Sequence, residues 1–108
     1  MEFMKPSKET IEALREHFTA RIIQPLMLPF VQAISEKKWL PTCYLAPRLT
    51  GLYVMPTVGP GGQPFFIRPG SGNCYTIEDS PAGHKGNMTL DQVLEILDKW
   101  FAAHSAAF

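Results

Sequence analysis

The sequence has too few cysteines and too little net charge for several common classes of small protein. Only two of its 108 residues are cysteines, Cys43 and Cys74, whereas a small disulfide-held domain needs more. Ten Lys and Arg balance ten Asp and Glu. The chain therefore lacks the cationic surplus of nucleic-acid binders and polybasic membrane-surface proteins, and we expect neither nucleic acid nor membrane as a partner.

Long apolar runs and a leader segment are also missing. The most apolar stretch, 22–31, contains Pro25 and Pro29 and is far shorter than the roughly 20 residues of a membrane helix. Charged residues near the start, among them Lys5 and Lys8, interrupt any signal-peptide core. The sequence thus predicts a soluble, cytoplasmic protein whose two cysteines are reduced thiols.

What is present suits one folded domain. A length of 108 residues with 45% apolar residues allows a single core, and we predict one domain over 1–108. Residues 1–6 and 104–108 are expected to fray. Met4 is an alternative start, in which case Met1–Phe3 come from a cloning site, so no argument rests on those three residues.

Apolar spacing predicts helices at both ends of the chain. In the N-terminal third, Pro25 and Pro29 remove two backbone donors from an otherwise helical pattern, so we expect a proline-kinked helix or a helix pair, over about 8–23 and 29–38. At the other end, Thr89 begins a capping box that predicts the start of a C-terminal helix. Its apolar face comprises Leu90, Val93, Leu94, Leu97, Trp100 and Phe101.

The middle of the chain predicts strands, because aromatic and aliphatic residues alternate with turn sequences there. A Pro-Gly-Ser-Gly sequence at 69–72 indicates a tight turn, so the strands on either side should form a hairpin. We interpret 78–87 as a loop. The predicted strands are 42–46, 49–55, 65–68 and 73–77.

A run of strands between helices indicates the α+β class, with a four-stranded, mainly antiparallel sheet and the C-terminal helix packed on it. Both faces of the strand at 49–55 are apolar, since Tyr53 and Met55 alternate with Leu52 and Val54. A two-layer domain needs only one apolar sheet face. The second face should therefore be covered by a helix, a partner chain or a ligand.

Charged residues nearly vanish from the centre of the sequence, where Arg48 and Arg68 stand alone between Trp39 and Ile77. If both guanidinium groups reach one place, they can clamp a carboxylate or a phosphate. Alternatively, each arginine lies on the rim, solvated or paired with Glu78, Asp79 or a helix acid, and the sequence leaves this open. The candidate ligand-binding residues are Arg48, Arg68, Tyr53, Tyr75 and His84.

An enzyme is the weaker interpretation. Cys74 precedes a loop with Asp79 and His84, so a thiol nucleophile with a base can be drawn, but no motif of a known cysteine enzyme surrounds it. His17 and His104 lie far from His84 and lack the spacing of metal ligands. We expect no catalytic residue, metal or cofactor, with Cys74 and His84 as the alternative.

These observations favour a small non-enzymatic interaction or binding module. A zero net charge and a second apolar sheet face favour self-association, so the sequence predicts a homodimer. A different protein partner and a small anionic ligand are the alternatives. The apolar stretch 22–31 covers more than one helix face, and the predicted interface residues are Ile23, Leu26, Met27, Phe30 and Val31.

Overall fold

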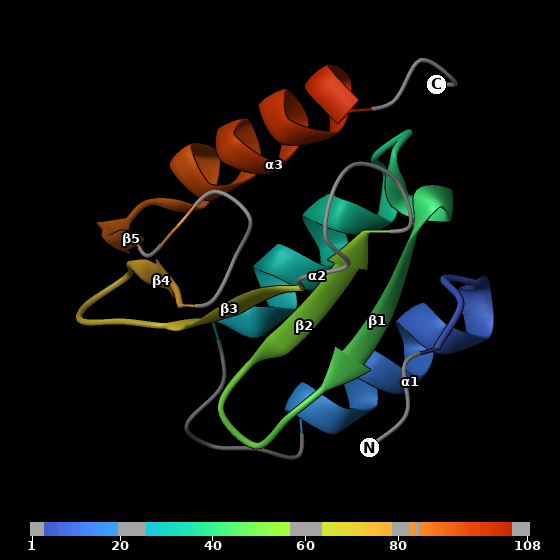
Figure 1. Ribbon diagram of the computed structural model, residues 1–108. Coiled ribbons are helices and arrows are strands. Elements are labelled where there is room, and N and C mark those ends of the chain that lie inside the picture. The colour runs from blue at the N-terminus through green and yellow to red at the C-terminus, as the bar shows by residue number, and fades with distance from the viewer. Residues whose placement is uncertain (1–3, 20–25, 57–63, 79–82, 84, 105–108) are drawn as a thin grey trace.

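Three helices and five strands make up the computed structural model, which describes residues 4–19, 26–56, 64–78, 83 and 85–104 (Figure 1). The elements follow the predicted α+β order, with helices first, strands in one run and a helix last. They are α1 (Lys8–Thr19), α2 (Met27–Ser35), a 3₁₀ turn (Leu40–Thr42), β1 (Cys43–Pro47), β2 (Leu52–Pro56), β3 (Phe65–Pro69), β4 (Tyr75–Ile77), β5 (Lys85–Met88) and α3 (Leu90–His104).

The sheet is an antiparallel meander in which each strand pairs with the next along the chain, in the order β1-β2-β3-β4-β5. The predicted hairpin is confirmed as β3 and β4, with Ile67 opposite Ile77. Gly72 in its turn has a φ of 62°, a backbone conformation that glycine adopts without strain.

The structure adds a fifth strand to the four that the sequence predicts. β5 lies in the segment interpreted as a loop, and its first three residues, Lys-Gly-Asn, are poor strand formers. It pairs with β4 through Tyr75 opposite Met88 and Ile77 opposite Lys85, with an irregular register between them. Pairing with a neighbour, rather than local propensity, therefore makes this segment a strand.

The helix boundaries follow the proline and capping positions. α2 begins at Met27, two residues before the predicted start, because Pro29 lies in the first turn, where a missing backbone N–H needs no partner. Pro25 lies outside the described residues. At α3 the predicted capping box is present: the Thr89 N–H donates to Gln92 Oε1 at 2.9 Å, and the Gln92 N–H donates to Thr89 Oγ1 at 3.2 Å.

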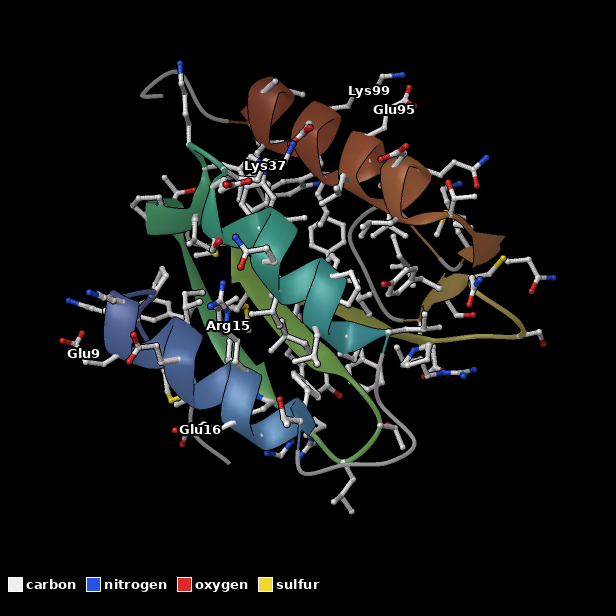
Figure 2. The ribbon with its side chains drawn as sticks, turned by 180° about the vertical axis from the view of Figure 1, so that it is seen from behind. Glu9, Arg15, Glu16, Lys37, Glu95 and Lys99 are labelled. Carbon is white, nitrogen blue, oxygen red and sulfur yellow. The ribbon has the colours of Figure 1, made fainter. Side chains whose placement is uncertain are left out.

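All three helices cover the same face of the sheet. Figure 1 views the sheet with the helices behind it, and Figure 2, turned by 180°, shows the helices in front. Apolar residues of α1, α2 and α3, such as Phe18, Phe30 and Leu97, are fully buried in one core with the sheet. The inward-facing sheet residues of this core are Cys43, Leu45, Leu52, Val54, Phe65, Ile67, Tyr75, Ile77 and Met88.

The N-terminal segment lies along the outer edge of β1. The Met4 N–H donates to the Leu45 carbonyl at 2.6 Å, and the Leu45 N–H donates to the Met4 carbonyl at 2.8 Å. Part of the free edge of the sheet is therefore paired within the chain. In the described residues, no helix combines the length and the apolar character that crossing a membrane requires.

Candidate binding face of the sheet

The sheet face that points away from the helices, here called the outer face, carries aromatic and apolar side chains. Alternation along each strand sends every second residue to this face, and none of these residues belongs to the core cluster. The second apolar face expected from the sequence is therefore present, and none of the described helices covers it (Figure 1). The outer face consists of Tyr44, Ala46, Arg48, Tyr53, Met55, Phe66, Arg68, Thr76 and Glu78. Ala46, Phe66 and Thr76 are nevertheless buried within the chain, at 2%, 7% and 7% exposed.

An aromatic pair stands at the centre of the outer face. Tyr53 and Phe66 lie opposite each other on β2 and β3, with ring centroids 4.5 Å apart. The guanidinium carbon of Arg48 lies 5.2 Å from the centroid of the Tyr53 ring, which is within the range of a cation–π contact. Arg48 follows β1, and its carbonyl oxygen is 3.2 Å from Nε2 of His17 on α1.

The two arginines of the central segment belong to one cross-strand row. The Arg48 N–H donates to the Gly51 carbonyl at 2.8 Å, so these two residues face each other across the β1–β2 turn. Gly51 in turn lies beside Arg68, because an added Cβ on Gly51 would be 2.9 Å from Arg68 Cβ. Arg48 and Arg68 therefore share one end and one face of the sheet, separated by a residue without a side chain.

Arg68 is paired with an acid of its own chain. Its Nε donates to Glu78 Oε1, and its Nη1 donates to the Pro69 carbonyl at 3.3 Å. The two charged side chains remain 37% and 36% exposed, so water screens this pair. Arg48 differs: within the described chain, its guanidinium contacts the Tyr53 ring and no carboxylate lies within ion-pair distance.

Tyr75 faces the core and not the outer face. It is 2% exposed, and its hydroxyl donates to the carbonyl of Leu26. Desolvation by this burial raises the pKa of the Tyr75 hydroxyl. Three of the five predicted ligand residues, Arg48, Arg68 and Tyr53, thus come together, while Tyr75 does not join them and His84 lies outside the described residues.

The two thiols differ in environment. Cys43 is 1% exposed, and its Sγ donates to the Leu40 carbonyl at 3.1 Å. Burial raises the pKa of the Cys43 thiol from 9.0 to about 12, so it stays protonated at neutral pH and is a poor nucleophile. Cys74 is half-buried and lies immediately before β4. Its predicted catalytic partner, His84, is not among the described residues.

The predicted interface residues of α2 serve the core of this chain. Met27, Phe30 and Val31 are 0% exposed. Leu26 is half-buried and its carbonyl accepts the Tyr75 hydroxyl, while Ile23 lies outside the described residues. On the sheet, the apolar side chains that remain partly exposed for a partner are Tyr44, Tyr53 and Met55. Of the members of the outer face, sequence reasoning missed Phe66, although a period of two ending at Arg68 places Phe66 on the same face.

In the part of the chain that the structure describes, no three His, Cys, Asp or Glu side chains gather closely enough to hold a metal ion. No protein-family model, curated protein or solved structure matches the chain. Function must therefore be inferred from the outer face itself.

Proposed function

We propose that this protein is a non-enzymatic interaction module of the cytoplasm that forms a homodimer through the outer face of its sheet. The observation that carries this proposal is the arrangement of the layers: three helices cover one face, while the partly exposed Tyr53 and Met55, with Arg48 beside the Tyr53 ring, lie on the other. Tyrosine and arginine are the residue types that most often dominate the energy of protein interfaces. Tyr53 and Arg48 supply both.

A face is better suited to this role than an edge. At the β1 edge, the Leu45 backbone groups are already bonded to Met4. At the other edge, β5 is four residues long and exposes Lys85 and Asn87, and short, charged edge strands resist pairing with another chain.

Solution mass is the direct test of self-association. We expect light scattering to report a mass approaching two chains at about 200 µM and falling toward one chain near 1 µM, as for an interface of micromolar affinity. Met55→Lys places a charge on the outer face and should give a monomer at every concentration, because desolvating an unpaired ammonium group is unfavourable. Ala13→Lys adds the same charge on the exposed side of α1 and should leave the mass unchanged.

Circular dichroism should show that both variants are folded. A wild-type chain that stays monomeric over the whole concentration range contradicts the homodimer. Equal masses for Met55→Lys and Ala13→Lys, both dimeric, would contradict the outer face as the interface.

The row that contains Arg48 and Arg68 favours a second function, the binding of a small carboxylate or phosphate. A ligand that bridges the two arginines must compete with Glu78 for Arg68. Glu78→Gln should therefore tighten the binding of citrate or inorganic phosphate, as followed by the NMR shifts of the arginine Nε–H groups. An unchanged spectrum in both proteins contradicts this function.

A further inference from the structure

We propose that a cleft between α1 and the segment that runs from the end of α2 to the 3₁₀ turn binds a small monocarboxylate with an apolar body. All residues that line this cleft belong to the N-terminal segment, α1, α2 and the 3₁₀ turn. The site is therefore separate from the outer face of the sheet and does not depend on the proposed homodimer. Its apolar floor, its two basic side chains and its single acid together specify the ligand.

The cleft has the volume of a small-molecule site. This volume is about 350 Å³, at the lower end of the range for ligand pockets. Because a water molecule occupies about 30 Å³ in the liquid, the cleft accommodates roughly 12 non-hydrogen atoms. A short apolar body with one polar group has this size, whereas a nucleotide is too large.

The floor of the cleft is apolar. Leu40 of the 3₁₀ turn is 8% exposed, and Ile11 of α1 is half-buried against the same core. Pro6 adds an apolar wall. A ligand with an apolar body removes its own surface from water on these side chains, which favours binding. A bare ion such as acetate has too little apolar surface to gain from this floor.

Hydrogen bonds on both sides of Pro6 hold its wall in place. Before Pro6, the backbone of Met4 exchanges two hydrogen bonds with that of Leu45. The carbonyl of Lys5 accepts the hydroxyl of Thr10 at 2.8 Å, and Thr10 is 9% exposed. The cleft is therefore formed within the chain itself, and a preformed site loses little conformational entropy when a ligand binds.

Two basic side chains flank the cleft from one face of α1. Lys8 and Arg15 are about two helical turns apart, so they share the face that carries Ile11. In Figure 2 the Arg15 side chain extends from α1 toward α2. Within the described residues, no carboxylate lies within ion-pair distance of either basic group. A guanidinium group in this position can hold a ligand carboxylate by two parallel hydrogen bonds.

The single acid of the lining sets the charge of the ligand. Glu12 lies between Lys8 and Arg15 in the sequence, at spacings that make it a neighbour of both on the helix surface. Two cations and one anion leave the lining with one net positive charge, which a monoanion neutralises. A second negative charge on the ligand would face Glu12. The lining therefore favours a monocarboxylate over a phosphate monoester, which carries close to two negative charges at neutral pH.

The exposure of the charged groups limits the affinity. Lys8, Glu12 and Arg15 are all exposed, so water screens their charges. For a ligand of this size in an open cleft, we expect a dissociation constant of roughly 1 mM. The probe 3-phenylpropanoate combines a single carboxylate with an apolar body that the cleft can accommodate.

NMR titration with 3-phenylpropanoate tests the site. We expect saturable shifts of the Ile11 methyl groups and of the Arg15 Nε–H. Arg15→Gln should weaken binding about tenfold, because it removes the forked contact to the carboxylate. Ser35→Leu keeps every charge but fills the α2 side of the cleft, and should abolish binding. Lys85→Gln removes an exposed cation from β5 and should leave binding unchanged. Circular dichroism checks that each variant is folded.

Three analogues of the probe test the ligand class. The uncharged 3-phenylpropanamide should bind at least about tenfold more weakly, because it lacks the charge that the guanidinium group recognises. Phenylsuccinate, with a second carboxylate, should also bind more weakly, because like charges repel. Phenylalanine should do the same, because its ammonium group cancels the net attraction to the lining. Tighter binding of phenylalanine or of phenylsuccinate than of 3-phenylpropanoate would overturn the monocarboxylate.

The position of the shifts separates this site from the functions proposed above. Saturable shifts at Ile11 and Arg15 that Ser35→Leu removes support the cleft. No shift at about tenfold above the expected constant, or wild-type affinity in both Arg15→Gln and Ser35→Leu, overturns it. Shifts confined to Arg48 and Arg68 overturn the cleft and support an anion site on the outer face instead. A monomeric chain that binds the probe in the cleft contradicts only the homodimer.

Discussion

At the scale of single residues, Asp98 connects the last helix to the segment after α2. Its Oδ1 accepts the Trp39 Nε1–H at 2.7 Å, and its Oδ2 accepts Lys37 Nζ at 2.8 Å. Trp39 is 3% exposed, and its ring stacks on Phe101 with centroids 4.4 Å apart. One carboxylate thus satisfies a buried indole donor and orients the ring that closes one end of the core.

Asp98→Ala should lower the free energy of unfolding by about 1–3 kcal/mol, because the Trp39 N–H loses its partner in a site with little access to water. Urea denaturation followed by tryptophan fluorescence measures this. Glu95→Ala is the matched control on the same helix. Its ion pair with Lys99 is exposed (Figure 2), and removing it should change stability by less than about 0.5 kcal/mol. Equal losses in the two variants would contradict a special role for Asp98.

Cys43 should make stability depend on pH in the alkaline range. Its folded pKa, about 12, lies above the ordinary 9.0, so the unfolded chain loses the thiol proton first. The stabilisation is complete below pH 9 and is lost as pH rises toward 12, by at most about 1.4 kcal/mol per pH unit. Urea midpoints measured between about pH 8 and 10 should fall in the wild type and flatten in Cys43→Ala. Cys74→Ala controls for removal of a thiol, and a flat wild-type profile would contradict the prediction.

Residue identities alone predicted part of the candidate site. Arg48 and Arg68 stand out in the sequence because no acid lies near them, and Tyr53 lies on a strand whose alternation is clear. The sequence does not give the register between strands, however, so it does not determine which face of the sheet Tyr75 occupies. In the structure Tyr75 opposes Pro69, one residue beyond Arg68, and this single step turns its ring into the core.

At the scale of elements, the two ends of the chain differ in how much local sequence determines. α3 carries its own start signal: Thr89 and Gln92 exchange both hydrogen bonds of a capping box, and Met88 and Val93 at the staple positions are both buried. β5 has no comparable local signal. It forms because β4 offers unpaired backbone groups beside it and because Met88 enters the core.

Thr89→Ala should lower the free energy of unfolding by about 1 kcal/mol, since the Gln92 N–H at the start of α3 loses its acceptor. Thermal denaturation followed by circular dichroism measures the loss. Thr50→Ala, in the exposed turn between β1 and β2, removes the same hydroxyl from a site without a cap and should be nearly neutral. A neutral Thr89→Ala would show that tertiary packing alone determines where α3 begins.

At the scale of the whole molecule, charge and apolar surface are divided between the two layers. Glu9 and Glu16 on α1, and Glu95 with Lys99 on α3, project from the outer sides of the helices (Figure 2). The outer face of the sheet has few charges, which are the two arginines and Glu78. The zero net charge of the sequence therefore conceals a molecule with a strongly charged layer and a mainly aromatic one.

A dimer through the outer face should make the melting temperature depend on protein concentration, because association stabilises only the folded chain. Between about 5 and 200 µM, the wild type should melt several degrees higher at the upper concentration. Met55→Lys should melt at one temperature throughout, and Ala13→Lys should follow the wild type. A concentration-independent wild type would agree with a monomer and contradict the proposed function.

The sequence by itself determined the α+β class, the C-terminal helix with its cap, the β3–β4 hairpin and the presence of a second apolar sheet face. These features depend on periodicity, capping and turn residues, which act over a few neighbours along the chain. Only the tertiary structure decided that all three helices share one face, that Met27, Phe30 and Val31 are buried within the chain, and that Arg48 and Arg68 fall in one row across Gly51. The physical reason is that layer assignment and strand register arise from contacts between residues far apart in the sequence, and no local pattern encodes them.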